Sequence, residues 1–268
     1  MSAGTSEDIE TRDCPVVVAI DQWSDFSARI NENIGEFLTG RFVFRGQRDS
    51  GFSLVSSFDR RYRELSFDRR RNIESSLLAH YREAVSRHGL GAYEDVTLSM
   101  GQHFGLPTRW LDWTESRYIA AFFAFAGLED KYLSHSDAAE VSEDLRVAVF
   151  ALDTSSPVID DERLRLIQPK FTDSNPRMTA QLGLFLQNRT LRASVEECIH
   201  EYMAASLDSM GIAPLYRFDL PIREARVALR DLAEMGISYS RLFPGLEGAA
   251  KEAKLDDWLG TPVPRMRD

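Results

Sequence analysis

Hydrophobic residues recur along this chain with two different periods. Short β-branched, aromatic or alternating runs predict strands at residues 16–20, 41–47, 146–152, 183–186 and 215–220. Apolar residues spaced three or four apart predict helices at residues 21–38, 66–87, 97–104, 117–127, 194–210, 221–235 and 246–259. We expect Gly40 to stop the first helix, Pro221 to open the helix at 221–235, and Gly236 to cap that helix.

The helix at residues 117–127 is apolar on nearly every face, which is typical of a helix at the centre of a fold. Strands and helices follow one another without a regular rhythm, and no internal repeat is present. This pattern predicts the α+β class, with a mixed or mostly antiparallel sheet flanked by helices. We expect a flexible polar tail over residues 1–12 and a single domain over residues 13–268.

Composition narrows the class of partner. The 268 residues are enough for one large domain or two small ones, and a content of 43% hydrophobic and 28% charged residues is typical of a soluble protein with an ordinary core. A net charge of −10 argues against a surface for duplex nucleic acid, because that affinity comes mostly from neutralised phosphates. One basic run interrupts the acidic chain, formed by Arg60, Arg61, Arg63, Arg69, Arg70 and Arg71. Such a run is either a solvated helix face or a contact surface for an anionic partner.

The cysteines and the N-terminal segment indicate the cellular compartment in which the protein is expected. Cys14 and Cys198 show no paired metal-ligand spacing, so we expect neither a metal site nor a disulfide framework. The first ten residues lack the basic and apolar regions of a signal peptide, and the longest apolar run is too short to span a bilayer. These features predict a cytoplasmic protein with no membrane partner.

A dense polar cluster leads directly into the apolar helix at residues 117–127. Its polar members stand among large apolar residues such as Trp110 and Trp113; they are His103, Thr108, Arg109, Asp112, Thr114 and Glu115. Charged groups held among aromatic residues must be paired or solvated, because burying them alone is costly. The combination predicts a lined pocket.

Four segments together resemble the FRG domain family. They read VFRGQ at 43–47, QHFGLPTRWLDWT at 102–114 continuing into AAFFA at 120–124, PRMTAQLGLF at 176–185, and GIS at 236–238 with LFPGL at 242–246. A bare Phe-Arg-Gly triplet recurs by chance, whereas the order and spacing of all four segments are specific. The resemblance covers roughly residues 18–255, and the family name does not by itself imply a function.

A weaker similarity concerns the ADP-ribosyltransferase superfamily, in which a split sheet clamps NAD. This resemblance implies that Arg45 on the first strand holds the ribose or the pyrophosphate. It implies that Thr108 or Thr114 orders the nicotinamide side and that Gln181 on a later strand bonds a ribose hydroxyl. NAD would be the substrate, and the sheet of this protein would also be split.

Gln181 departs from the pattern of the superfamily, which usually has Glu at the corresponding position of the later strand. A neutral amide stabilises an oxocarbenium-like transition state far less than a carboxylate does. Either Asp112 or Glu115 would then supply the missing negative charge, or the site would bind its ligand without reacting.

Each residue of the FRG segment has a structural interpretation beside the functional one. Arg45 could hold a phosphate or carboxylate through two parallel hydrogen bonds, or form a buried pair with Asp112. Gly46 could allow a close approach of the backbone or simply turn the chain. Gln47 could orient an amide of the ligand.

The later residues carry the same two interpretations. His103 could act as an acid or base near neutral pH, or be a hydrogen-bonded core residue. Arg109 could contact the ligand or pair locally with Asp112. Asp112 could serve the site or brace the following helix, and burial and a nearby arginine would move its pKa in opposite directions. Trp113 could stack on a flat ring or pack in the core.

Two classes of function follow from these residues. The first is an ADP-ribosyltransferase or NAD glycohydrolase-like enzyme, with Arg45, Asp112, Gln181 and His103 as catalytic candidates and a protein or nucleic-acid acceptor as partner. The second is a non-catalytic module that senses a nucleotide or another anionic ligand. A toxin or phage-conflict role is compatible with either class.

Overall fold

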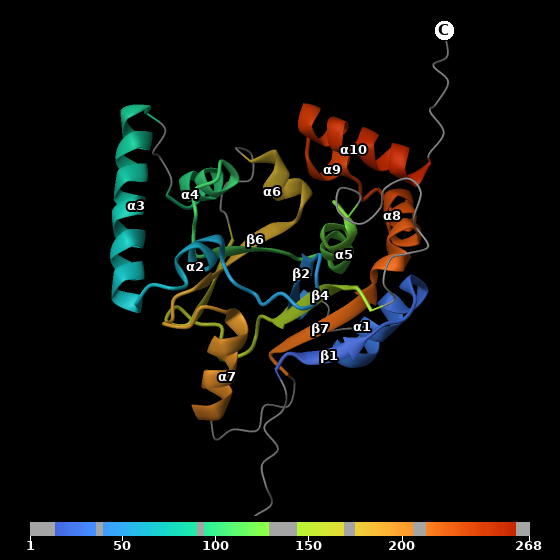
Figure 1. The fold of residues 1–268 in the computed structure, drawn as a ribbon, viewed down its shortest axis with the longest axis horizontal. Helices are drawn as coiled ribbons and strands as arrows, with labels where there is room; N and C mark the ends of the chain where they lie inside the picture. Colours follow the sequence, from blue (N-terminus) through green and yellow to red (C-terminus); the bar gives the residue numbers. More distant parts are fainter. Residues whose placement is uncertain are drawn as a thin grey trace, which may run out of the picture.

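The computed structural model describes residues 14–35, 40–89, 94–128, 144–168, 175–205 and 213–260 (Figure 1). The expected tail at residues 1–12 and most of the loop after residue 128 lie outside these ranges. Within them, none of the helices combines the length and apolar character that crossing a bilayer requires.

One seven-stranded mixed sheet organises the protein, in the order β1-β7-β4-β2-β3-β6-β5. The strands are β1 Val16–Ala19, β2 Phe42–Gln47, β3 Trp110–Thr114, β4 Arg146–Asp153, β5 Leu164–Ile167, β6 Gly183–Asn188 and β7 Leu215–Pro221. β1 pairs in parallel with β7, and the other neighbours are antiparallel. The predicted α+β class with a mixed, mostly antiparallel sheet is confirmed.

Helices flank this sheet on both faces and at one end (Figure 1). They are η1 Trp23–Asp25, α1 Phe26–Ile34, α2 Ser57–Tyr62, α3 Phe67–Arg87, α4 Glu94–His103, α5 Arg117–Phe125, α6 Pro176–Ala180, α7 Val195–Ala205, η3 Ile222–Glu224, α8 Ala225–Glu234, α9 Tyr239–Leu242 and α10 Leu246–Leu259. One core joins α1, α5, α8, α9 and α10 to one face of the sheet. A second core joins α7 to the opposite face.

Helix α5 is central, as its sequence predicts. Six of its nine residues are buried, and its apolar surface packs against β2 and β4 in the larger core. The Ser116 side chain caps the helix by accepting a hydrogen bond from the amide of Ile119 at 3.3 Å. A helix that is apolar on all sides must be surrounded by other elements of the fold. Helix α5 therefore forms the centre of the helical layer on this face of the sheet.

Helix α3 differs from α5 in its burial. It spans 21 residues, yet none of them is buried, and Figure 1 shows it standing at the edge of the molecule. Its apolar stripe contributes only half-buried side chains, Leu78 and Tyr81, to a small third core around Trp110 and Phe185. The outer face of α3 is therefore open to solvent.

Several predicted boundaries were wrong for local reasons. The first helix ends at Ile34 because Gly35 adopts a φ of 83°, a left-handed conformation that breaks the helix before Gly40. Pro221 closes β7, pairing with Arg146, and a 3-10 turn follows it. Its φ of −69° with ψ of 139° is extended, and a residue without an amide hydrogen suits the end of a ladder. Gly236, with a φ of 80°, follows α8 as expected.

Five elements were not predicted: β3, β5, α2, α6 and α9. The β3 sequence WLDWT is buried at every position except Asp112, so it lacks the alternation that marks a strand. The other four elements have only four to six residues each, too few for a period to emerge. Gln181 was expected on a strand, but it lies in the turn between α6 and β6.

Candidate functional site

The sheet has a seam between β2 and β3. The ladder between these strands registers at a single pair, Phe44 with Thr114, whereas β2 pairs with β4 over six residues and β3 with β6 over five. The seam divides the sheet into a four-stranded part, β1-β7-β4-β2, and a three-stranded part, β3-β6-β5. Among the described residues, the β2–β3 ladder does not continue on either side of the Phe44–Thr114 pair.

Arg45 occupies the seam on one side of that pair. Its Nη1 donates a hydrogen bond to the backbone oxygen of Asp112 at 2.5 Å, across the gap between the strands. The Arg45 Nε is buried and has no hydrogen-bond partner among the described residues. Burial lowers the pKa of Arg45, Asp112 opposes that shift, and the charge of Arg60 adds to it. A buried donor without an acceptor is costly, so the Arg45 Nε is an unsatisfied polar group at the seam.

Asp112 is held by a short chain of hydrogen bonds. The Thr108 hydroxyl donates to Gln102 Oε1 at 2.6 Å, and Gln102 Nε2 donates to Asp112 Oδ1 at 2.9 Å. The Thr108 contact therefore fixes which end of the Gln102 amide faces the carboxyl. Desolvation raises the pKa of Asp112, while the charge of Arg45 and a backbone hydrogen bond oppose the rise.

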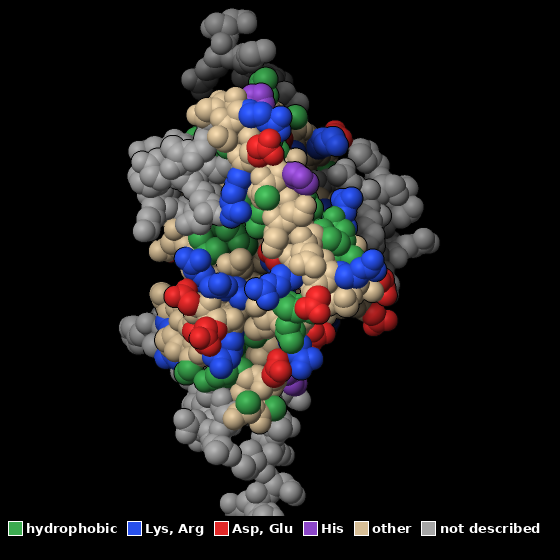
Figure 2. Space-filling model, turned by 90° about the vertical axis from the view of Figure 1, so that its left-hand side faces the viewer, with side chains coloured by type: hydrophobic (Ala, Val, Ile, Leu, Met, Phe, Trp, Pro, Cys, Tyr) green, Lys and Arg blue, Asp and Glu red, His purple; other side chains and the backbone are tan. Residues whose placement is uncertain are grey.

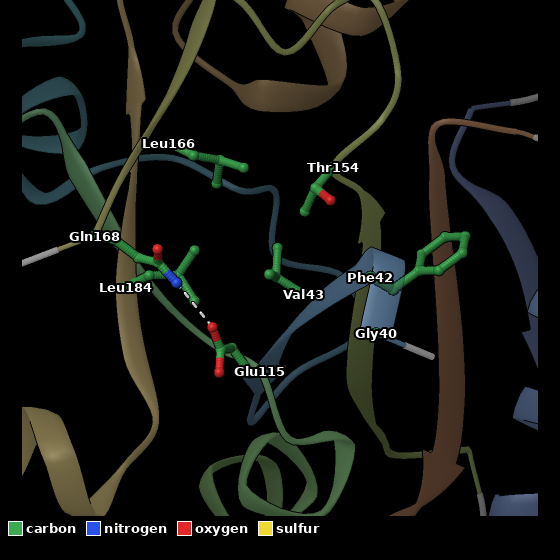
Figure 3. Close-up of a pocket in the computed structure, with 8 residues that line it drawn as sticks. All are labelled: Gly40, Phe42, Val43, Glu115, Thr154, Leu166, Gln168 and Leu184. Carbon is green, nitrogen blue, oxygen red and sulfur yellow. Dashed lines mark hydrogen bonds between the residues drawn. The ribbon is translucent and has the colours of Figure 1, made fainter. Parts of the chain in front are cut away.

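A cavity of about 430 Å³ lies on the other side of the Phe44–Thr114 pair (Figure 3). Val43, Leu166 and Leu184 give it apolar walls, and Thr154 contributes a hydroxyl. Glu115 stands at its edge and accepts a hydrogen bond from Gln168 Nε2 at 2.9 Å. Apolar walls with a few convergent polar groups are typical of small-molecule sites.

Gly46 and Gln47 serve the fold in this conformation. A Cβ at Gly46 would lie 2.0 Å from the backbone oxygen of Ala120 and 2.6 Å from the amide nitrogen of Ala124. The group that approaches Gly46 closely is therefore α5. Gln47 Nε2 donates to the backbone oxygen of Phe52 at 2.7 Å and braces the turn after β2.

The sequence allowed Arg109 to pair locally with Asp112, but in the structure Arg109 has other partners. It is 8% exposed, and its Nε donates to Asp59 Oδ2 at 3.2 Å. Its Nη2 donates to the backbone oxygen of Thr190 at 3.0 Å. Asp59 also accepts a hydrogen bond from Arg70, so Arg109 belongs to a buried ionic network that ties β3 to α2 and α3.

Thr114 and Gln181 connect three of the sequence motifs. The Thr114 hydroxyl donates to the backbone oxygen of Gln181 at 2.7 Å, and Gln181 Nε2 donates to the backbone oxygen of Leu242 at 3.0 Å. The amide that was expected to bond a ribose hydroxyl is thus engaged within the protein.

His103 and Trp113 lie in opposite environments. His103 is exposed at the end of α4, where Arg177 Nη1 approaches its ring nitrogens at 2.9 and 3.1 Å, and Arg177 also pairs with Glu247. Trp113 is 3% exposed and packs in the core on the α7 side of the sheet. Among the described residues, neither His103 nor Trp113 makes a hydrogen bond, ion pair or ring contact with Arg45. No group of three or more potential metal ligands occurs among the described side chains.

The FRG family model matches residues 40–132. This segment is therefore similar to the FRG domain over about a third of the chain. The matched segment contains β2, α2, α3, α4, β3 and α5, so it supplies both strands of the seam. The third and fourth motifs lie beyond the match, and strands from outside it complete the sheet. Comparison of the chain with curated proteins and with solved structures found no match.

Gln102, Thr154 and Gln168 were not among the residues predicted for the site. Gln102 stands within the second motif, where a polar residue one helical turn before Gly105 was a usable signal. Thr154 and Gln168 follow β4 and β5 directly, and no local pattern distinguishes them. Only the pairing of distant strands shows that they border the same cavity.

Proposed function

We propose that this protein binds NAD along the seam between β2 and β3 and cleaves its nicotinamide–ribose bond, as an ADP-ribosyltransferase or NAD glycohydrolase-like enzyme. One observation carries the proposal. At the seam, an arginine with an unpartnered buried Nε lies on one side of the Phe44–Thr114 pair, and a cavity with a carboxylate at its edge lies on the other.

The anionic part of NAD would bind at Arg45. A guanidinium group can donate two parallel hydrogen bonds to a pyrophosphate, and the pairing is strong because both partners are charged. The unpartnered Nε supplies one of these donors without breaking a contact in the protein. The Asp112 carboxyl, neutralised in part by Arg45, would accept a hydrogen bond from a ribose hydroxyl.

The nicotinamide end would enter the cavity. Its ring is flat and carries a positive charge in NAD, so apolar walls with Glu115 at the edge provide suitable surroundings. When the carbon–nitrogen bond breaks, its electron pair leaves with nicotinamide and positive charge develops on the ribose. A carboxylate beside that charge stabilises the transition state. Glu115 supplies this carboxylate, because Gln181 is neutral and engaged with Leu242. Water or an acceptor then attacks the ribose carbon and loses its proton to solvent or base.

The hydrogen bond between Gln181 and Leu242 favours a second function, in which the ligand is bound but not cleaved, because it occupies the amide that was expected to contact the ribose. In this case the Arg45 side of the seam would hold an anionic nucleotide as a sensor, and the Glu115 carboxylate would only help to position it.

Incubation of the full chain with NAD tests the enzyme, with nicotinamide release measured by chromatography and label transfer measured on added protein and nucleic acid. The matched variants are Arg45→Ala and Arg29→Ala, which remove the same charge from the seam and from an exposed ion pair on α1. We expect turnover in the parent and in Arg29→Ala and its loss in Arg45→Ala. Saturable NAD binding without nicotinamide release would instead support the sensor, and absence of both would refute the site.

A further inference from the structure

A group of exposed arginines lies where α2 leads into α3. We define the α2–α3 arginine surface as Arg60, Arg61, Arg63, Arg69 and Arg71, all of which are exposed. Figure 2 views the molecule from the side on which α3 stands and shows basic side chains gathered across the middle of this face.

These arginines are only partly neutralised by the protein. Arg63 pairs with Glu64 in an exposed contact, which contributes little in water. Arg69 and Arg71 make no hydrogen bond or ion pair with the described residues. The nearby carboxylate of Asp59 is 1% exposed and already bonded to Arg70 and Arg109, so it does not neutralise the surface.

The charge of this surface contrasts with that of the rest of the chain. Residues 57–71 hold six arginines and three acidic residues, a net charge of +3, in a chain of net charge −10. The remaining residues therefore carry a net charge of −13. A polyanion is repelled by most of such a molecule and attracted at one place, which orients its approach.

We infer that the α2–α3 arginine surface binds the phosphate backbone of a single-stranded nucleic acid. All cations of this surface are arginines, whose planar groups bind phosphates through two bonds and also stack on rings. Arg61 lies over the ring of half-buried Tyr62, at 5.7 Å from its centroid; the Tyr62 ring itself packs on the buried ring of Phe58. Such a stack offers a platform for an unpaired base, which a duplex keeps inside its helix.

The surface borders the seam. Arg60 belongs to the arginine surface, and it lies close enough to Arg45 for its charge to act on that group. A bound strand would therefore pass near the candidate NAD site, where it could serve as an acceptor. Strand binding itself does not depend on NAD or on the proposed reaction.

Fluorescence anisotropy tests this inference with the full chain and a short labelled single strand, as RNA and as DNA, at several salt concentrations. The test variant is Arg69→Ala with Arg71→Ala, and the matched control is Arg29→Ala with Arg223→Ala, two exposed arginines on α1 and η3. Each phosphate contact on a single strand contributes about 0.7 to the slope of log affinity against log salt. The test variant should lower that slope by about 1.4 and weaken binding about tenfold at physiological salt, whereas the control should match the parent.

The same titration is repeated with a duplex and with vesicles that contain phosphatidylserine. Weaker binding to both than to the single strand supports the inference. Equal loss of affinity in the test and control variants, or no binding of the single strand, would overturn it. Tighter arginine-dependent binding to vesicles or to the duplex would show that the partner class is wrong.

Discussion

Replacing Gly46 by alanine tests how the FRG segment supports the fold. The added Cβ would lie 2.0 Å from the backbone oxygen of Ala120, 2.6 Å from the amide nitrogen of Ala124 and 3.0 Å from the carbonyl carbon of Ala120. These are backbone atoms of α5, which cannot rotate away as a side chain would. The helix must shift by more than 1 Å, as estimated from contact distances of about 3.5 Å between non-bonded atoms.

The expected cost follows from the position of α5. Overpacking a core costs about 1–3 kcal/mol, and more where backbone has to move. Because α5 contacts both the sheet and α8, we expect Gly46→Ala to lower the free energy of unfolding by about 3 kcal/mol or more. For a chain of this size, that corresponds to a fall in melting temperature of about 6–12 °C.

Urea denaturation followed by circular dichroism measures this change. Gly40→Ala is the matched control, because a Cβ there meets no atom within 4 Å; we expect it to shift the free energy by less than about 0.5 kcal/mol. If Gly46→Ala is as stable as the control variant, the close packing of β2 against α5 is not what requires glycine in this motif.

Three further predictions concern the contacts around the site. Arg109→Ala should lower the free energy of unfolding by about 3 kcal/mol, because it leaves buried Asp59 with one fewer cation; urea titration against the exposed Arg63→Ala checks this, and equal stability would contradict it. Gln181→Glu should place a carboxylate against the Leu242 oxygen, destabilising the protein without increasing nicotinamide release; faster release would restore Gln181 to the site. Hydrogen bonds from Lys251 and Arg177 lower the pKa of Glu247 from 4.5 to about 2, so its contribution to stability is present above pH 4.5 and is lost as the pH falls towards 2; carboxyl NMR titration should find the pKa of Glu247 raised in Lys251→Ala, and an unchanged pKa would contradict this cause.

Elements with a sustained period could be predicted from the sequence. The apolar helix α5, the strands β4 and β7 and the long helices α3 and α10 follow from residues that repeat at one spacing over several turns or a full strand. The strand β3 could not, because burial on both faces removes the alternation. Short elements such as α2 and α6 depend on tertiary contacts rather than on their own periodicity.

Only part of the candidate site could be predicted from the sequence. The sequence pointed to Arg45 and Asp112, which the structure brings together across the seam. It could not show that Gly46 faces α5 or that Gln181 bonds Leu242, since both depend on contacts between segments far apart in the chain. The cavity could not be predicted for the same reason, because Val43, Gln168 and Leu184 come from separate segments of the chain.

Calorimetric titration with ADP-ribose tests the central claim most directly, because this ligand carries the pyrophosphate without nicotinamide. We predict saturable binding to the parent and to Arg29→Ala, and binding at least tenfold weaker to Arg45→Ala, since a hydrogen bond between charged groups contributes about 1.5–3 kcal/mol. Equal affinity in Arg45→Ala and Arg29→Ala, or no binding to the parent, would contradict an anion site at the seam.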